Sequence, residues 1–181
     1  HGEILFSHPE KLSHVSFQLE SEILAEDRYN NNSEFVEGGV DHGRTALEII
    51  GAGGNLNSIV DLLGIAYLLA RPFQAISTGE TRKVLIARAL MSNPELLILE
   101  EPFSGLDISS RQEMLHLFEQ LLDMGVQLLL FDNFHEALPD RIDHLIYISE
   151  GRISLDGNRK DVLESPEWES HNKRQIQLPH Q

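Results

Sequence analysis

The chain has 181 residues, enough for one domain with a real hydrophobic core but not comfortably for two. It carries 29 acidic against 14 basic residues, for a net charge of −15, which argues against binding to the phosphate backbone of nucleic acids because such binding needs basic clusters. These residues contain no cysteine and no apolar run of membrane-spanning length, so disulfides, thiolate metal sites and a spanning helix are excluded within them.

Two short strands are predicted at the start of the chain. Residues 2–6 (GEILF) and residues 12–17 (LSHVSF) are short runs that mix apolar and polar residues, and each is expected to form a β-strand. Gln18 falls at the end of the second run. Taken alone, a glutamine in this place is an ordinary surface residue.

Residues 19–75 are predicted to form a helical insertion with a loose beginning. The stretches 30–33 and 38–43 have the composition of loops, whereas residues 45–50 and 58–69 show the apolar spacing of helices. The glycines of this region do not form a phosphate-binding loop, because they follow no strand and Gly-Lys-Ser/Thr is missing.

A helix with a phosphate-binding start is predicted next. Ser77 can cap a helix that begins at Thr78, and Glu80 can reach back to complete a capping box. Gly79 lets a ligand approach the backbone closely, and the N–H groups of a first helical turn favour a phosphate. The helix is expected to bury an apolar face and to stop at residues 93–94, which are Asn-Pro.

A buried strand that ends in two carboxylates follows this helix. Residues 96–99 are an apolar run of strand length, typical of a parallel strand covered on both faces. Glu100 and Glu101 come where the strand emerges, which is the edge of an α/β sheet where ligands usually bind. A polar loop then comprises Ser104, Gly105, Leu106 and Asp107.

A second helix and strand are predicted after this loop. Ser110 and Glu113 have the spacing of a capping box, and Gly125 is placed to end the helix behind them. The apolar spacing of this helix predicts that it buries Met114, Leu117, Leu121 and Met124. Residues 126–131 then form another apolar run of strand length.

The last part of the chain is predicted to contain a hairpin. Residues 145–148 and 153–155 are apolar and flank a Glu-Gly turn, and a short helix is expected near residues 161–163. From Ser165 onward the chain is polar, and residues 165–181 are predicted to be a flexible tail or linker.

These motifs, in this order, resemble those of the ATP-binding cassette (ABC) ATPases. The matching positions are Gln18 for the Q-loop, Ser77-Thr78-Gly79-Glu80 for the signature motif LSGGQ or LSGGE, Leu96–Glu100 for Walker B, Glu101 for the catalytic glutamate, and Ser104-Gly105-Leu106-Asp107 for the D-loop. The resemblance covers residues 2 to about 164 and implies an α/β P-loop NTPase-like cassette, residues 1–164, with a mostly parallel sheet. A helical subdomain, about residues 22–92, would be inserted before the signature motif.

The resemblance also implies the chemistry, with ATP and Mg²⁺ as cofactors. Glu101 would orient or deprotonate the attacking water, and Mg²⁺ would be held indirectly by Glu100 and Gln18. In this family two cassettes face each other head to tail. Ser77 and Gly79 would therefore contact the γ-phosphate held by a partner cassette, and Asp107 would cross the interface.

The sequence departs from the family pattern in several places. Glu100 stands where the family has Asp, and Thr78 replaces the usual Gly. At the switch position, which is normally His, the chain has Asp132 or Asn133, depending on the spacing used, with His135 close by. No GxxxxGK[S/T] loop occurs, so we expect a cassette fragment truncated at its N-terminus and inactive by itself.

The stretch STGETRK and the block that follows it resemble the first cassette of tandem ABC ATPases linked to molybdate handling. This resemblance implies a second cassette, in tandem or as a homodimer, a membrane permease subunit as partner, and a cytoplasmic location on the inner face of the membrane. One alternative is a catalytically degenerate regulatory cassette. Another is a soluble ABC ATPase of DNA repair or translation, although the coiled-coil insertion or basic arm of those proteins is not visible.

Overall fold

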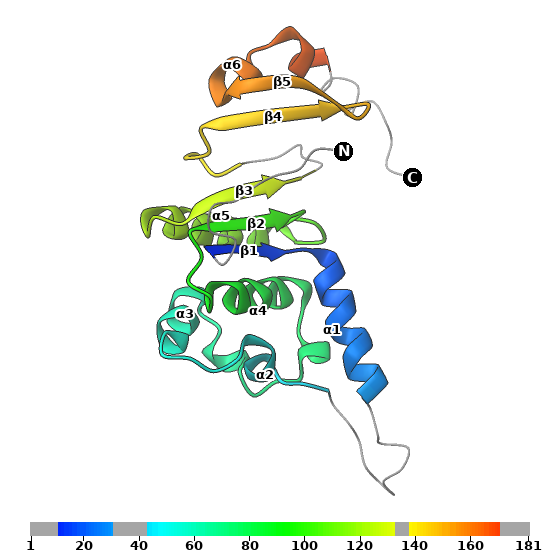
Figure 1. Cartoon of the computed structure of the whole chain (residues 1–181), viewed down its shortest axis with the longest axis vertical. Coiled ribbons are helices and arrows are strands. Elements are labelled where there is room, and N and C mark those ends of the chain that lie inside the picture. Colours follow the sequence, from blue (N-terminus) through cyan, green and yellow to red (C-terminus); the bar gives the residue numbers. More distant parts are fainter. Residues whose placement is uncertain (1–10, 31–42, 133–137, 171–181) are drawn as a thin grey trace, which may run out of the picture. The chain divides into compact units, whose positions relative to one another are not determined.

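The computed structural model describes residues 11–30, 43–132 and 138–170 (Figure 1). The chain divides into two compact units, His1–Asn133 and Phe134–Gln181. The strand expected at residues 2–6 lies outside the described residues. In chain order the elements are β1 (Leu12–Val15), α1 (Phe17–Asn30), α2 (Ala46–Ile50), α3 (Leu56–Leu63), η3 (Ala66–Leu68), η4 (Phe73–Ala75), α4 (Thr78–Leu90), β2 (Leu96–Glu100), α5 (Ile108–Asp123), β3 (Gln127–Phe131), β4 (His144–Ser149), β5 (Arg152–Asn158) and α6 (Arg159–Leu163).

The first unit contains a parallel sheet in the order β1-β2-β3 (Figure 1). Leu96 at the start of β2 is in register with Leu12 on β1 and with Gln127 on β3. Leu97 and Leu99 of the central strand are buried, while Leu96 and Ile98 are half-buried. The carboxyl ends of the three strands therefore lie at one edge of the sheet, where residues 100 and 101 emerge.

The transition from β1 to α1 differs from the expected one. The strand ends at Val15, and the Ser16 hydroxyl accepts the N–H of Leu19 (3.3 Å), so the chain turns at once into a helix of 14 residues. The insertion is therefore helical from its first residues, and the loop stretches predicted at residues 30–33 and 38–43 lie almost entirely outside the described residues. Gln18 lies in the first turn of α1 and not in a loop after a longer strand.

The remainder of the insertion consists of short helices. The helix expected over residues 58–69 is divided, because α3 ends at Leu63 and Gly64 adopts a left-handed conformation (φ 64°). A glycine tolerates this conformation without the steric cost that a Cβ atom would bring. The helix expected at residues 45–50 is present as α2, and it begins with a capping box between Thr45 and Glu48.

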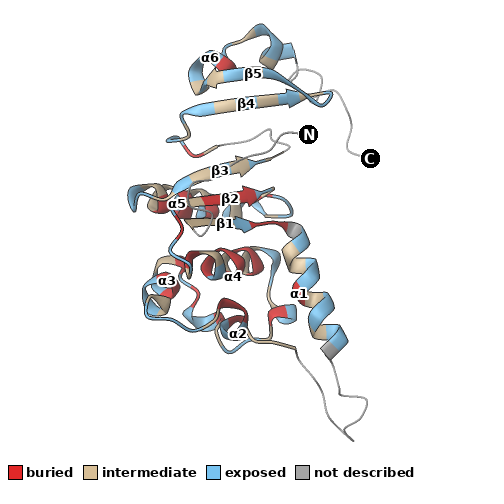
Figure 2. Cartoon of the chain, in the orientation of Figure 1, coloured by how far each residue is buried: buried red, intermediate tan, exposed pale blue. Residues whose placement is uncertain are grey.

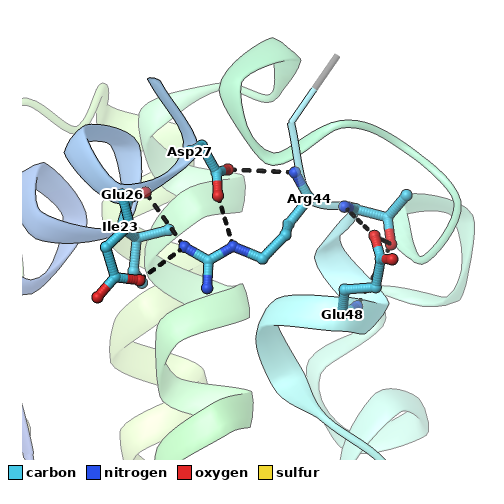
Figure 3. A network of polar contacts seen from close by, with 6 residues as sticks. Ile23, Glu26, Asp27, Arg44 and Glu48 are labelled. Atoms are coloured by element: carbon cyan, nitrogen blue, oxygen red, sulfur yellow. Dashed lines mark hydrogen bonds and ion pairs between the residues drawn. The ribbon is translucent and has the colours of Figure 1, made fainter. Parts of the chain in front are cut away.

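Arg44 fastens the start of this helical part to α1 (Figure 3). Its guanidinium contacts the carboxylate of Asp27, that of Glu26 (3.0 Å) and the carbonyl of Ile23 (3.2 Å). Its backbone N–H also donates to Asp27 (3.1 Å). These bonds tie the segment before α2 to the last turns of α1.

Helix α4 is the centre of the first unit, and Figure 2 shows it largely buried. It packs against β1, α2 and α3. Buried residues occur around most of its circumference, as expected of a helix enclosed by other elements. They are Thr81, Arg82, Val84, Leu85, Ile86, Ala87 and Leu90.

Helix α5 begins earlier than its sequence suggested. The capping box expected between Ser110 and Glu113 is wrong, because the helix starts at Ile108 with Asp107 as its N-cap. Its core-facing residues Met114, Leu117 and Leu121 are buried as the apolar spacing predicts, whereas Met124, also predicted to be buried, is exposed.

The second unit is a hairpin with two short helical segments. Strands β4 and β5 pair antiparallel, with an irregularity beside Tyr147, and α6 packs against them. Residues 166–170 are helical, so the expected flexible tail is wrong for its first residues. The Ser165 hydroxyl accepts the N–H of Trp168 (3.2 Å), and the Trp168 ring meets Tyr147 edge to face at 5.7 Å between centroids.

Candidate functional site

The start of α4 has the predicted capping box. The Ser77 hydroxyl accepts the N–H of Glu80 (3.4 Å), and Glu80 Oε2 accepts the N–H of Ser77 (2.7 Å). Ser77 and Thr78 are exposed, and Gly79 is half-buried. The N–H groups of Thr78 and Gly79 lie in the first turn, where no carbonyl four residues back within the helix can reach them. The helix start can therefore donate hydrogen bonds to an anion.

Two residues of the insertion contact the same carboxylate. Glu80 Oε1 accepts from the Tyr67 hydroxyl (3.1 Å) and from Arg71 Nη1 (3.4 Å). The hydrogen bond from the Ser77 N–H is the main cause that lowers the pKa of Glu80 below its usual range, with smaller contributions from Tyr67 and Arg71. Burial, followed by the bond to Glu80, raises the pKa of Tyr67. Glu80 is thus held as a carboxylate.

The loop after β2 ends in a second helix cap. Asp107 Oδ1 accepts the N–H of Ser110 (2.8 Å), and Oδ2 accepts the Ser110 hydroxyl (3.2 Å). The backbone bond from Ser110 is the chief cause that lowers the pKa of Asp107. Within the loop, Gly105 has a positive φ of 73°, and the N–H of Leu106 donates to the carbonyl of Phe103 (3.2 Å).

The start of α4 and the loop after β2 lie against each other. A Cβ atom on Gly79 would stand 3.3 Å from Ser110 Oγ, and one on Gly105 would stand 3.6 Å from Thr78 Cγ2. One turn further along α4, Lys83 Nζ pairs with a carboxylate oxygen of Glu113 (2.6 Å). The predicted signature and D-loop positions are therefore neighbours within this one chain.

Glu101 leaves β2 with an unusual backbone. Its φ is 45°, which is uncommon for a residue with a side chain, and its N–H donates to the carbonyl of Phe131 (2.6 Å). The carbonyl of Glu101 accepts the N–H of Ser104 (3.1 Å). Non-glycine residues with such angles cluster at functional sites, because the surrounding structure must maintain them.

Glu100 contacts a histidine of the neighbouring strand. His14 Nε2 on β1 lies 3.0 Å from Glu100 Oε1, and both side chains are about half exposed, at 45% and 49%. His14 and Gln18 line the same shallow surface hollow beside Ser16 and Glu22. The Gln18 amide donates to Glu22 (2.9 Å). Gln18 is therefore near the residue that contacts Glu100, although within the described part of the chain no hydrogen bond joins Gln18 directly to Glu100.

Arg82 is a buried cation between these elements. Its side chain is only 2% exposed on α4. Burial lowers the pKa of Arg82, against the opposing influence of the negative charges of Glu20 on α1 and Glu101. The guanidinium therefore lies within electrostatic reach of the predicted catalytic carboxylate.

The predicted switch position is only partly described. Asp132 directly follows β3 and is half-buried, while Asn133 and His135 lie outside the described residues. Within the described part of the chain, no three His, Asp or Glu side chains form a metal-binding group. Mg²⁺ favours oxygen ligands and retains several waters, so the exposed Glu100 carboxylate suits an indirect contact to this ion.

The structure adds residues that the sequence patterns did not single out. They are His14, Tyr67, Arg71 and Arg82. Arg82 shares a helix face with Leu85 and Ile86, three and four positions on, and this spacing was the available signal that its side chain points inward. For His14 and Tyr67 no comparable signal exists, because their contacts depend on how the elements pack.

None of the described helices is long and apolar enough to span a bilayer.

The family model of the ABC transporters matches residues 2–104 of the sequence. The chain is 34% identical over 164 residues to the ABC transporter ATP-binding protein ModF of Escherichia coli (strain K12), which covers 88% of this chain and 33% of that protein. It is 36% identical over 114 residues to the molybdenum import ATP-binding protein ModC of Mannheimia succiniciproducens, covering 62% of this chain and 32% of that protein. The chain spans about a third of the length of these curated relatives.

Solved structures show the same arrangement of elements. The ATP-binding cassette MJ1267 of an ABC transporter matches with a TM-score of 0.62 at 21% identity, covering 90% of this chain and 68% of that one. The protein cbiO1 from Clostridium perfringens, part of the ABC transporter complex cbiONQ, matches with a TM-score of 0.55 at 28% identity, covering 69% and 49%. At 21% identity, the match to MJ1267 shows that the two chains share a fold.

Proposed function

The chain belongs to the ABC transporter family of ATPases, and from this premise we propose that it acts as an ATP-binding and ATP-hydrolysing cassette whose helix α4 completes the ATP site of a partner cassette. The family resemblance and the α/β cassette fold predicted from the sequence are both confirmed. The observation that carries the proposal is the exposed, capped start of α4, with Ser77 and Gly79 beside the loop that leads to Asp107. A helix start of this kind offers N–H groups and a hydroxyl to a phosphate.

The end of β2 supplies the residues for hydrolysis. When bound, ATP and Mg²⁺ supply the γ-phosphoryl group and the cation that neutralises its charge. Glu101 would hold the attacking water and accept its proton, while Glu100 would hold the cation through its water shell. Gln18 would be a second indirect contact, supported by the hollow that it shares with His14.

The system that this cassette serves is inferred from its relatives. The ModC relative is named a molybdenum import ATP-binding protein. The ModF relative is named an ABC transporter ATP-binding protein. We assign to this chain a role in molybdate-type anion transport, with a second cassette, in tandem or as a homodimer, and a membrane permease as partners. It would then work in the cytoplasm, on the inner face of the cell membrane.

A specific observation also favours a second candidate, a degenerate regulatory cassette. His14 already contacts Glu100 at 3.0 Å, and Glu100 itself replaces the family's aspartate. Asp132 or Asn133, depending on the spacing used, stands where the family has a histidine, and the carboxylate of Asp132 there would repel phosphate. Such a cassette would bind and close without turning over ATP at its own site.

Steady-state ATP turnover by the complete gene product tests the proposal. Replacing Glu101 by Gln should lower turnover about 100-fold or more while ATP still binds, because a positioned general base contributes that much. The matched control is Glu95→Gln at the opposite end of β2, where the side chain is 70% exposed and pairs with Lys11. Equal rates for Glu101→Gln and the wild type would instead assign the regulatory role. Residues 1–181 alone should show no turnover, since they contain no GxxxxGK[S/T] loop.

A further inference from the structure

The helical insertion reaches the start of α4 through one carboxylate. Glu80 Oε1 accepts hydrogen bonds from the Tyr67 hydroxyl (3.1 Å) and Arg71 Nη1 (3.4 Å). Glu80 Oε2 accepts the N–H of Ser77 (2.7 Å). Each oxygen of this carboxylate therefore has its own donors, and those on Oε1 come from the insertion alone.

Arg71 is held in place independently of Glu80. Its Nη2 donates to the carbonyl of Ala75 (3.0 Å). Its own carbonyl accepts the N–H of Ala46 (3.0 Å), and the carbonyl of Arg44 accepts the N–H of Phe73 (2.8 Å). The guanidinium is therefore anchored on the backbone before α4 and does not depend on the contact with Glu80.

The same segment is fastened to α1. A β-bridge joins Thr45 to Pro72, next to Arg71, and the side chain of Arg44 donates to Asp27 and to the carbonyl of Ile23 on α1 (Figure 3). Polar contacts thus run without a break from α1, through the segments around residues 44 and 71, to Glu80 and Ser77.

These contacts determine how well the cap is oriented. A glutamate side chain on its own rotates about three bonds and leaves Ser77 N–H bonded only part of the time. Two donors on Oε1, one of them charged, restrict that rotation and keep Oε2 on Ser77. The Ser77 hydroxyl, which accepts the N–H of Glu80, is fixed by the same arrangement.

We propose that Tyr67 and Arg71 are positioning residues that fix the Glu80 carboxylate and so orient Ser77 and Gly79 for the phosphate of a partner cassette. This inference rests on the function proposed above for α4. Neither residue touches the nucleotide in this role. The part of the insertion that Arg44 fastens to α1 thereby sets the geometry of the start of α4.

The test uses Tyr67→Phe, Arg71→Gln and Arg71→Lys in the complete gene product. The first readout is amide hydrogen exchange at Ser77, which should become about fivefold faster in Tyr67→Phe and Arg71→Gln, since each removes one donor to Glu80 Oε1, a bond of modest net strength. The second readout is the ATP concentration for half-maximal turnover, which should rise about five- to tenfold. Arg71→Lys should restore part of both effects.

Matched controls separate positioning from general disturbance. Tyr29→Phe changes a tyrosine of α1 that is 90% exposed, and Arg28→Gln changes its exposed neighbour; both should leave the two readouts unchanged. In a Glu80→Ala background, Tyr67→Phe and Arg71→Gln should have no further effect, because their action runs through the missing carboxylate.

The outcomes distinguish this inference from the proposed function. Faster exchange at Ser77 with an unchanged ATP requirement would overturn the positioning role, as would effects that persist in the Glu80→Ala background. Unchanged exchange in both variants would overturn the contact itself. A wild-type protein without any ATP turnover would refute the proposed function instead, and the exchange of the Ser77 amide would still decide whether Tyr67 and Arg71 hold the helix start.

Discussion

The start of α4 and the end of β2 both present carboxylates, but the two are held differently. Glu80 contacts residues that are close in sequence, such as Ser77 and Arg71. Glu100 instead contacts His14 of another element, β1, and the negative charge of Glu101 acts on the buried guanidinium of Arg82 on α4. The carboxylate of Glu80 is therefore held by local contacts of modest strength, whereas Glu100 and Glu101 acquire their partners only when α4, β1 and β2 are assembled.

The largest expected effect comes from Arg82, at the assembled end of β2. Replacing it by Ala should lower the free energy of unfolding by about 3 kcal/mol, because it removes a buried cation and leaves carboxylates without it. The measurement is urea unfolding followed by circular dichroism. Arg88→Ala, an exposed arginine on the same helix, is the matched control and should cost less than about 0.5 kcal/mol.

An equal, small loss for both arginine variants would contradict this comparison. It would mean that the Arg82 guanidinium contributes little despite its burial, as isosteric replacements of buried ion pairs sometimes show. Arg82→Met sharpens the test, because it keeps most of the volume of the side chain and removes the charge together with its N–H donors. It should recover part of the loss.

The next largest effect is a difference in stability between alanine substitutions at two glycines. Gly105→Ala, in the loop after β2, should cost about 1–2 kcal/mol, because φ of 73° is left-handed. Gly79→Ala, in α4, should be nearly neutral in unfolding: alanine gains up to about 1 kcal/mol of helix propensity, offset by the close contact of its Cβ with Ser110 at 3.3 Å. Urea unfolding of both variants checks the pair, and a larger loss for Gly79→Ala would reverse the comparison.

The features that could be predicted from the sequence are those that depend on contacts between neighbouring residues, and not those that depend on the assembly of several elements. The capping box of Ser77 and Glu80 was readable from spacing alone, since its partners lie three residues apart. The central strand β2 was readable from its apolar run, and the parallel sheet is confirmed. These features depend on a few neighbouring residues.

The failures have equally physical reasons. Two caps were possible at the start of α5, and Asp107 prevails over Ser110 because its carboxylate accepts both the N–H and the hydroxyl of Ser110. The serine cap at Ser16, which turns the chain into α1, has no Glu or Gln three residues on to mark it in the sequence, so the pattern places Gln18 at a strand end. The contact of His14 with Glu100 depends on strand register, which one sequence does not disclose.

A smaller effect compares the two helix caps that flank the candidate site. Ser77→Ala and Asp107→Ala should each cost about 1 kcal/mol, the usual value for a lost N-cap. Asp107→Asn is the matched control, because asparagine caps helices about as well as aspartate does. Urea unfolding of the three variants gives the values. If Ser77→Ala lowers the free energy of unfolding much less than Asp107→Ala does, Glu80 holds the start of α4 without help from the Ser77 hydroxyl.

The smallest expected effect is a dependence of stability on pH at the start of α4. The Ser77 N–H, then the Ser77 side chain, Tyr67 and Arg71, lower the pKa of Glu80 from its ordinary value of 4.5, against a smaller opposing effect of burial. A carboxyl group whose folded pKa is depressed stabilises the fold above its unfolded pKa, and this stabilisation is lost as the pH falls through the folded pKa. As the pH decreases below 4.5, the free energy of unfolding should therefore decline in part through Glu80, and Glu80→Gln should show a shallower decline in that window.

Above that window the curves of the wild type and of Glu80→Gln should run parallel, because Glu80 is ionised in both the folded and the unfolded chain. Urea unfolding at a series of pH values measures both curves, and an unchanged slope below pH 4.5 would mean that the local contacts of Glu80 do not favour its charged form.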